Sequence, residues 1–407
     1  MVQNSKNRRQ EYDVVVAGHL CLDIIPKIPK TSVQTIGELL RPGKLVNVES
    51  AVVSTGGPVS NTGIGLKKLG MKVAFMARVS DDDFGRLIID RMQKQGNAST
   101  IKIVPNESSS YTIAIAVPSL DRAFLHNPGT NHAFNSDDLN FDVIRNSKIF
   151  HLGYPPLMRC LYEDEGEELL NIFKRVKETG VTTSLDMALP DPDSPSANVS
   201  WRKIVEKVLP FVDIFMPSIE EIFFMLAYEK YIDLRLKNQQ QDLIDLIDTS
   251  LFTELATHCL NLGAKLIVFK TAHRGIYFRS GSLSRILDLG RIIPAEPEEW
   301  ANRELWCPAF HVSNIASATG SGDSAVAGFL SAYNRGHSVE KCLKYANCLG
   351  YENLHELDAL SGIKSWAETS QLIDSSKLEL NDAMVAGEGW YWDEEEQLWI
   401  GPNQAAQ

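Results

Sequence analysis

The amino-acid sequence predicts an α/β fold with a central, mostly parallel sheet flanked by helices. Short apolar runs alternate with helical patterns from residue 137 onward, which is typical of βαβ units. Residues 13–18 (DVVVAG) form a β-branched run that ends in glycine, as a buried parallel strand does. At residues 316–333 a glycine-broken loop leads directly into a helix with an apolar face. The length of 407 residues allows one large α/β domain or two average domains.

The composition argues against several classes of protein. The formal net charge of −12 disfavours a nucleic acid or an acidic membrane as a partner. The sequence contains no apolar run long enough to cross a bilayer. The six cysteines are scattered without a Cys-x-x-Cys pair, so neither a zinc site nor a disulfide framework is indicated. We therefore expect a cytoplasmic protein.

The N-terminal part contains the first candidate ligand-binding residue. Residues 1–12 are polar and are expected to be a disordered lead-in. The first strand is expected to continue from residues 13–18 through HLCLDII as far as Pro26. Asp23 lies in this run among apolar residues, where an unpaired carboxylate is costly to bury. It therefore either faces water at the end of a strand or binds a ligand.

The middle of the chain continues the alternation of strands and helices. A second glycine-rich turn at residues 54–70 leads into a helical pattern, and a strand, an acidic loop and a helix follow it. Beyond residue 136 we expect helices at 137–147, 162–180, 200–212 and 219–226, and strands at 148–154, 181–188 and 213–218. This order of elements predicts parallel pairing of the strands.

The C-terminal half carries several additional segments. Residues 227–262 are expected to be a helical insertion followed by a helix that covers the sheet. A strand, a turn and a strand are predicted at 265–281, and a surface loop rich in proline and glutamate at 294–307. A further helix is expected at 337–354. The C-terminal extension, residues 364–407, contains WYWDEEEQLW, in which aromatic runs surround an acidic turn and predict a hairpin.

The loop at residues 316–333 has the chemistry of an anion site. Gly320 and Gly322 let the backbone turn tightly, so that successive N–H groups can point into one concavity at the positive end of the helix. Asp323 places a carboxylate at the mouth of this site. In a phosphoryl-transfer enzyme the amides would stabilise charge on the phosphoryl group while the carboxylate accepts the proton of an attacking hydroxyl. The alternative is that Asp323 only begins a helix, since aspartate is a favoured N-cap residue.

Two of these segments together resemble the signatures of a known family. GGPVSN at residues 56–61, followed by LKKLGMKVAFMARVSDDDFG at 66–85, resembles the N-terminal signature of the ribokinase-like (pfkB) sugar and nucleoside kinases. ATGSGDSAVAGF at 318–329 resembles their C-terminal signature. The two long signatures stand in the right order in the two halves of the chain. The pair is therefore much more specific than either signature alone.

The resemblance implies a ribokinase-like fold, in which a small β lid grows from one edge of the central sheet. The kinase domain would span residues 13–363. Residues 31–53 and 98–127 are the candidates for the lid, because parts of them alternate between apolar and polar residues as half-exposed strands do. Such a lid would close over a substrate and exclude water. Association of two copies through the lid is a further expectation.

The resemblance also implies a set of functional residues and two cofactors, ATP and Mg²⁺. Asp323 would be the catalytic base, and the transferred phosphoryl group would be held by the loop residues Gly320, Ser321 and Gly322. Substrate hydroxyls would be bound by Asp23, Gly56, Gly57 and Asn61. The nucleotide would contact Lys270, Gly275 and Asn347. Glu221, in the segment DIFMPSIEEI, would order Mg²⁺, a hard cation that prefers oxygen ligands.

Several positions depart from the family patterns or allow another interpretation. Ser317 and Ala318 replace an aspartate–threonine pair in a region that helps to build a monovalent-cation site in some relatives, so potassium activation is not assumed. Ser218 stands where asparagine is usual in the motif of Glu221. Glu221 could alternatively complement a helix dipole, and Lys270 could be an exposed lysine at a strand end.

The sequence therefore predicts an ATP-dependent kinase that phosphorylates a hydroxyl of a small sugar or sugar derivative. A nucleoside kinase of the same family is one alternative, because the residues around the substrate do not identify the acceptor. Another is a non-catalytic, sugar-binding regulatory relative, because the family residues around Asp186 and Asn347 are partly replaced. Turnover of ATP separates an enzyme from such a binding protein.

Overall fold

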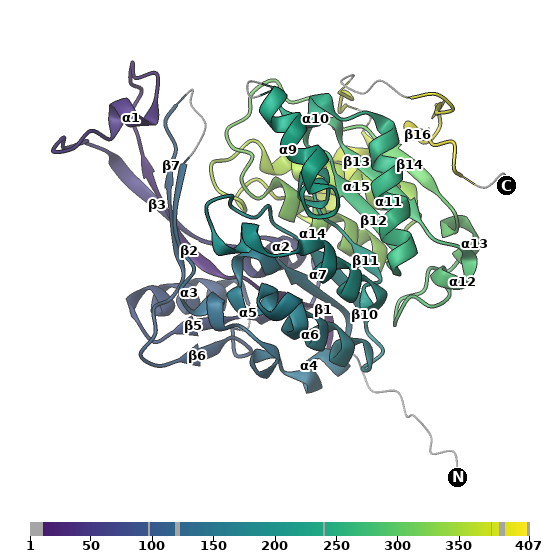
Figure 1. The fold of residues 1–407 in the computed structure, drawn as a ribbon, viewed down its shortest axis with the longest axis horizontal. Helices are drawn as coiled ribbons and strands as arrows, with labels where there is room; N and C mark the ends of the chain where they lie inside the picture. Colours follow the sequence, from purple (N-terminus) through teal and green to yellow (C-terminus); the bar gives the residue numbers. More distant parts are fainter. Residues whose placement is uncertain are drawn as a thin grey trace, which may run out of the picture.

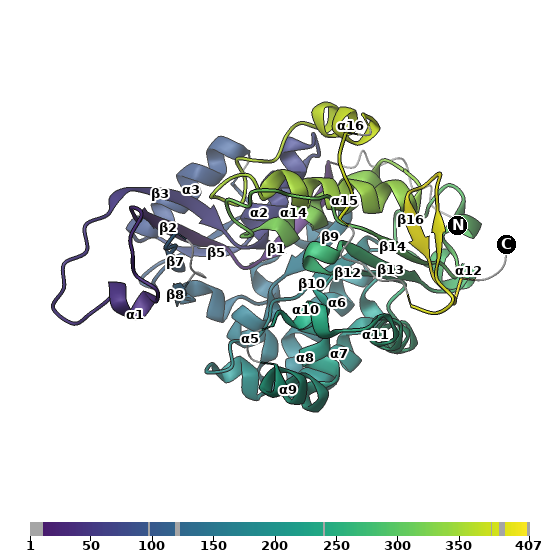
Figure 2. The same ribbon diagram turned by 90° about the horizontal axis from the view of Figure 1, so that it is seen from above.

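The computed structural model describes residues 11–96, 98–118, 123–238, 241–375, 377–381 and 387–404. A ten-stranded sheet forms its centre, and helices cover both faces of this sheet (Figure 1, Figure 2). Most of the lead-in expected at residues 1–12 lies outside the described residues, and Tyr12 already belongs to the first strand. None of the helices in these ranges is long and apolar enough to cross a membrane.

The central sheet is parallel over more than half of its width. Its strands are, in spatial order, β15 (Tyr391–Asp393), β16 (Leu398–Ile400), β14 (Glu304–Cys307), β13 (Ile276–Ser280), β12 (Leu266–Lys270), β11 (Ile214–Phe215), β10 (Thr182–Asp186), β9 (Ser147–Gly153), β1 (Tyr12–Gly18) and β4 (Val73–Met76). The pairs from β4 to β12 are parallel. The pairs from β12 to β15 are antiparallel. The predicted α/β fold with a mostly parallel sheet is confirmed.

Two layers of helices bury the two faces of the sheet. One layer contains α2 (Pro58–Lys68), α14 (Ser321–Asn334) and α15 (Val339–Asn353), and its core includes Val326, Phe329 and Leu343. The other contains α6 (Glu167–Lys177), α7 (Trp201–Val208), α8 (Ile219–Leu226) and α11 (Thr249–Leu262). Figure 2 shows these layers above and below the strands. Apolar residues at helical spacing explain this arrangement, because each helix buries one stripe against the sheet.

A separate four-stranded sheet, which we call the lid, projects from one side of the molecule (Figure 1). Its strands are, in spatial order, β3 (Glu49–Gly56), β2 (Cys21–Lys27), β7 (Tyr111–Ile115) and β8 (Ala123–Asn127). The expectation of one strand from residue 13 to Pro26 is therefore wrong. Gly18 ends β1 with a φ of 121° at a position where a Cβ would clash with the backbone of Gly153, and the chain then leaves the central sheet.

The remaining α-helices and one further strand pair lie around these sheets. They are α1 (Ile36–Leu39), α3 (Asp83–Gln95), α4 (Phe141–Arg145), α5 (Arg159–Tyr162), α9 (Tyr228–Lys237), α10 (Leu243–Leu246), α12 (Leu283–Ile286), α13 (Pro297–Trp300) and α16 (Trp366–Asp374), with β5 (Arg78–Ser80) paired to β6 (Lys102–Val104). In the segment expected to be a helical insertion, α9 and α10 precede α11, which packs on the sheet.

Two segments near the C-terminus lie deeper than the sequence indicated. The expectation of a surface loop at residues 294–307 is wrong for its last four residues, which form the fully buried strand β14, whereas Glu296, Glu298 and Glu299 are exposed. The aromatic residues near the C-terminus form the hairpin of β15 and β16. This hairpin extends the central sheet by pairing with β14, so that Trp399 lies beside Trp306. The C-terminal extension is therefore part of the main fold in the described residues.

Candidate active site

The predicted site residues gather at the carboxyl ends of the parallel strands, where ligands bind in open α/β sheets. Asp186 is the last residue of β10, and Lys270 is the last residue of β12. Three helices begin at the same edge, with Gly57, Ser218 and Gly320 as the N-cap residues of α2, α8 and α14. Strand ends and helix amino termini thus bring residues that are far apart in the sequence into one site.

The loop before α14 needs glycine for geometric reasons. Gly320 has a φ of 79°, a left-handed conformation that favours glycine, and a Cβ at this position would overlap the side chain of Ala359. The Ser321 amide donates to the Ala318 carbonyl at 3.2 Å, and the Ser321 hydroxyl donates to the same carbonyl at 3.0 Å. The next two amides, of Gly322 and Asp323, belong to the first turn of α14, which leaves N–H groups free for an anion.

The Asp323 carboxylate is buried and accepts three hydrogen bonds from other parts of the chain. Its Oδ2 accepts from Asn61 Nδ2 at 2.9 Å and from the Tyr154 hydroxyl at 2.8 Å. Its Oδ1 accepts from the Thr62 hydroxyl at 3.2 Å. Because Gly320 occupies the N-cap position, the alternative that Asp323 caps this helix is wrong. Burial raises the pKa of Asp323, although these hydrogen bonds and Lys270 act in the opposite direction.

Lys270 supplies a cation beside the loop. Its Nζ lies 2.5 Å from Asp186 Oδ1, and a Cβ on Gly322 would lie 3.5 Å from the Lys270 Cδ. Burial by itself lowers the pKa of Lys270, but the carboxylates of Asp186 and Glu221 outweigh it and raise this pKa. The pKa of Asp186 is raised by its complete burial, in spite of Lys270. Lys270 is mostly buried, so the alternative of an exposed strand-end lysine is wrong.

Glu221 stabilises the start of α8 and also contributes negative charge to the site. Its Oε2 accepts from the Ser218 amide at 2.7 Å, and the Ser218 hydroxyl accepts from the Glu221 amide at 3.2 Å. This capping box explains why serine can stand at position 218, because serine is a favoured N-cap residue. Burial raises the pKa of Asp186 and of Tyr154, and the charge of Glu221 adds to both shifts. The helix of Glu221 begins beside Lys270, because its N-cap residue Ser218 pairs with Lys270.

A cavity of about 680 Å³ brings the predicted nucleotide residues together. Its walls include Lys270, Gly275, Ser321, Gly322 and Asn347, together with apolar side chains of Val312, Ile315, Ala346, Tyr351 and Leu354. The Asn347 amide group donates to the carbonyls of Cys307 and Pro308, so it fixes the wall formed by that segment. Gly275 has a φ of 101°, and a Cβ there would overlap the Cys307 carbonyl. Apolar walls and a cationic end suit a nucleotide.

The residues predicted to bind substrate hydroxyls lie on the lid side of Asp323. A Cβ on Gly56 would overlap the Asp23 carboxylate, so the glycine makes room for this side chain. Gly57 has a φ of 83° and packs directly on His19. Burial raises the pKa of Asp23 to about 6. Asp23 lies inside β2 and not at a strand end, and it is only partly exposed to solvent. The Asn61 Oδ1 is buried and has no hydrogen-bond partner among the described residues, so it can accept from a ligand.

Three residues of this site, Tyr154, Thr62 and His126, were not predicted from the sequence. Tyr154 and Thr62 bind Asp323 directly. His19 and His126 meet with their Nε2 atoms 3.4 Å apart, which connects the large domain to lid strand β8. The position of Tyr154 in the sequence was the available signal, because it is the last residue of the strand predicted at 148–154 and the ends of parallel strands form sites.

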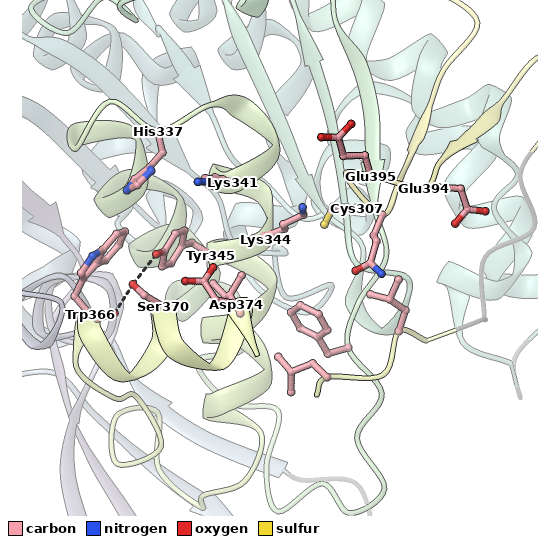
Figure 3. Close-up of a pocket in the computed structure, with 15 residues that line it drawn as sticks. Cys307, His337, Lys341, Lys344, Tyr345, Trp366, Ser370, Asp374, Glu394 and Glu395 are labelled. Atoms are coloured by element: carbon pink, nitrogen blue, oxygen red, sulfur yellow. Dashed lines mark hydrogen bonds between the residues drawn. The ribbon is translucent and has the colours of Figure 1, made fainter. Parts of the chain in front are cut away.

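A second cavity, of about 520 Å³, lies among α15, α16 and the C-terminal hairpin (Figure 3). Tyr345 stacks on Trp366 with 4.1 Å between ring centroids, and its hydroxyl lies 2.6 Å from the Ser370 hydroxyl. Lys344 forms an ion pair with Glu396 at 2.8 Å. These contacts attach α16 and the hairpin to α15. The lining residues include none of the predicted site residues.

The sequence was compared with protein families and with individual relatives. The family model described as pfkB family carbohydrate kinase matches residues 12–366. An uncharacterized sugar kinase of Archaeoglobus fulgidus is 23% identical over 301 residues, which cover 74% of this chain and 98% of the relative. Fructokinase-2 of Oryza sativa subsp. japonica is 21% identical over 374 residues, which cover 89% of this chain and 94% of the relative.

Solved structures agree in fold. A ribokinase of Arabidopsis thaliana complexed with ribose and ATP has a TM-score of 0.63 and 19% sequence identity, covering 89% of this chain and 98% of the other. A candidate ribokinase II from E. coli, in complex with ATP and Mg²⁺, has a TM-score of 0.66 and 17% identity, covering 89% of this chain and 99% of the other. At these identities the likeness establishes the fold alone.

Proposed function

The chain belongs to the pfkB family of carbohydrate kinases, and from that membership we propose that it transfers the γ-phosphate of ATP to a hydroxyl of a small sugar or sugar derivative. One observation carries the proposal. The buried Asp323 carboxylate lies in the first turn of α14, beside Lys270 of the nucleotide-sized cavity and in contact with Asn61 of the lid side. A base between a phosphate site and a polyol site is what this transfer requires.

In the proposed reaction Asp323 accepts the proton of the attacking hydroxyl. The hydroxyl oxygen forms a bond to the γ-phosphorus, the bond from that phosphorus to the bridging oxygen breaks, and ADP leaves with the electron pair of that bond. The amides of Gly322 and Asp323 stabilise charge on the transferred group, and Lys270 adds a positive charge at the same place. Gly320 and Ser321 shape the turn that presents these amides.

On the acceptor side, Asp23 and Asn61 would bind substrate hydroxyls through their side chains, and Gly56 and Gly57 would support this site by leaving room for Asp23 and His19. Asp23 comes from lid strand β2, so closure of the lid would bring this carboxylate to the substrate and exclude water. The small Gly56 is needed for this arrangement, because its lack of a side chain makes room for Asp23.

The residues present fit a bound Mg²⁺ whose coordination is completed by phosphate and water oxygens. Asp186 Oδ2 is buried and has no hydrogen-bond partner among the described residues, and Glu221 carries a second carboxylate on the helix whose N-cap residue, Ser218, pairs with Lys270. In the described part of the chain, no group of three His, Cys, Asp or Glu residues is placed to hold a metal. When bound, Mg²⁺ would neutralise charge on the phosphates. Glu221 and Asp186 would hold it.

The experiment is a substrate panel with the purified full chain. Mg-ATP is incubated with each of a set of sugars, sugar derivatives and nucleosides, and ADP release is measured. ADP release with at least one sugar well above the ATP-only background is expected. A strong preference for a nucleoside would contradict the proposed sugar acceptor and identify the protein as a nucleoside kinase. Sugar binding by calorimetry without ADP release would refute the enzyme and support a regulatory binding protein.

Association through the lid and a cytoplasmic location stay predictions. The lid offers two edge strands, β3 and β8, and β8 exposes Phe124 and Leu125, at 53% and 57% of their surface. Exposed apolar residues on an edge strand favour pairing with a second copy. Light scattering of the purified protein would measure the mass in solution, and a monomer at micromolar concentration would contradict the association.

A further inference from the structure

Tyr154 has an unusual backbone conformation at the centre of the site. It follows β9 with φ 66° and ψ 46°, a left-handed conformation that is uncommon for a bulky residue, and Pro155 follows it. Two contacts accompany this conformation. The Tyr154 amide donates to the Asp186 carbonyl at 3.2 Å, and its hydroxyl donates to Asp323 Oδ2 at 2.8 Å. Backbone strain of this kind persists where the surroundings fix it, and such places are often functional sites.

The hydrogen bonds to Asp323 are unequally distributed between its two oxygens. A carboxylate offers about four acceptor positions, two on each oxygen. Asn61 and Tyr154 both donate to Oδ2, whereas the Thr62 side chain donates to Oδ1. The described donors therefore fill Oδ2 and leave one acceptor position on Oδ1.

We propose that Tyr154 is a positioning residue for the base: it occupies Oδ2 of Asp323, so that Oδ1 accepts the proton of the attacking hydroxyl. This inference rests on the proposed function. Tyr154 acts through Asp323 and makes no bond to the reacting atoms. Its hydroxyl stabilises the ionised carboxylate, which is the form that can accept a proton. The hydrogen bond from the Tyr154 amide to the Asp186 carbonyl helps to hold this donor in place before substrate arrives.

The surroundings of Tyr154 keep its hydroxyl in the donor form. Burial and the Asp323 charge raise the pKa of Tyr154 well above its ordinary value, so it stays protonated. The other titratable groups that face this pair are Lys270 on β12, Asp186 on β10, Glu221 on α8, Asp23 on β2 and His19 after β1. Their charges act on Asp323 in the wild type and in a Tyr154→Phe variant alike, so a comparison of the two isolates the hydroxyl.

The test is the pH dependence of kcat/KM for Tyr154→Phe. Loss of one hydrogen bond to the charged form should move the acid limb of the profile upward by about 0.5–1 pH unit. The KM for ATP should stay within about twofold of the wild type. Tyr345→Phe is the matched control, because it also loses a buried tyrosine hydroxyl contact, 2.6 Å from Ser370, outside the site. A Tyr154→Phe profile that superimposes on the wild type, or a uniform loss of rate without a shift, would overturn the proposal.

A second measurement does not depend on turnover. With ¹³C-carboxyl-labelled aspartate, NMR titration follows the Asp323 signal, which is assigned by its disappearance in Asp323→Asn. Tyr154→Phe should raise the measured pKa of Asp323 by the same 0.5–1 unit, about the shift expected from the loss of one hydrogen bond. If the pKa of Asp323 shifts in Tyr154→Phe but the wild type releases no ADP with any acceptor of the substrate panel, the proposed kinase activity is refuted, while the contact between Tyr154 and Asp323 is supported. An active enzyme whose Asp323 pKa is unchanged in the variant would refute the positioning role alone.

Discussion

Replacement of Asp323 by asparagine should abolish most turnover while leaving the site folded. The asparagine Oδ1 can take the place of Asp323 Oδ2 and accept from Asn61 and Tyr154. Its Nδ2 then takes the place of Asp323 Oδ1 and can donate to the Thr62 hydroxyl, which is able to accept. The three neighbours therefore keep their partners. The position proposed for the substrate hydroxyl, however, becomes a donor that cannot take a proton.

The size of the effect follows from this geometry. Loss of a general base costs about 10²–10⁴ in rate, which corresponds to roughly 3–5 kcal/mol of barrier. We expect the loss of kcat to lie in the upper part of this range, because the asparagine Nδ2 presents an N–H donor where the attacking hydroxyl needs an acceptor. ATP affinity should change less than about threefold, since no predicted nucleotide contact is altered. The raised pKa of the buried Asp323 means that its ionised form weakens the fold, so Asp323→Asn should be at least as stable as the wild type at neutral pH.

The assay pairs turnover with binding. ADP release is measured with the best acceptor of the substrate panel, and ATP binding is measured by calorimetry without acceptor. Asp358→Asn is a control, because it makes the same chemical change in the neighbouring loop, where Asp358 Oδ1 accepts from the amides of Leu360 and Ser361. The control should keep the wild-type rate. If Asp323→Asn turns over within tenfold of the wild type, Asp323 is not the base.

Three further predictions concern Lys270, Asp23 and the contact of α16. Lys270→Met removes the cation beside the loop, so the KM for ATP should rise at least tenfold; an unchanged KM would contradict the phosphate role. The variant also leaves Asp186 buried without its ion-pair partner, so the free energy of unfolding measured in urea should fall by about 3 kcal/mol. Asp23 has a pKa of about 6 in the folded protein, above its ordinary 3.8, so the folded state binds the proton more tightly and stability falls as pH rises from about 4 to 6. Asp23 alone should lower the free energy of unfolding by about 3 kcal/mol over this range. The melting temperature should therefore decline less with pH in Asp23→Asn than in the wild type, and parallel curves of melting temperature against pH would refute the raised pKa of Asp23. Trp366→Ala removes the stack on Tyr345, so denaturant titration should show a free energy of unfolding lower by about 2 kcal/mol. ADP release should show an unchanged kcat, and a large loss of kcat would mean that α16 affects the active site.

The sequence predicted the elements whose causes are local. The loop before α14 was found because glycine freedom and the helix amino terminus act within a few residues, and Gly320 does adopt the left-handed conformation. The fold class and the family are confirmed for the same reason, since alternating strands and helices and two signatures are patterns along the chain. Ser218 is a further case, because its capping box with Glu221 spans three residues.

The errors of the sequence analysis come from contacts that are distant along the chain. The segment at residues 294–307 looked like surface because it is rich in charge, yet Glu304 is fully buried. Its carboxylate accepts from the hydroxyls of Thr253 and Tyr277, each at 2.7 Å, and from the Asn403 amide at 2.9 Å. A buried carboxylate is tolerated when it is hydrogen-bonded, and no pattern within the segment reports such partners. The division of β1 from β2 was missed because it depends on the backbone of Gly153.

The same distance explains why the base could be predicted and its environment could not. Asp323 stands in a recognisable motif, but Thr62 and Tyr154 are 261 and 169 residues away from it. Burial and these donors have opposite effects on the Asp323 carboxylate, because burial favours the neutral acid and hydrogen bonds favour the anion. A base needs both influences, since an anion that is too stable does not accept a proton and a neutral acid cannot. The strength of the base is therefore a property of the folded site, and within it the Tyr154 hydroxyl is a contribution that can be removed without changing the shape of the ring.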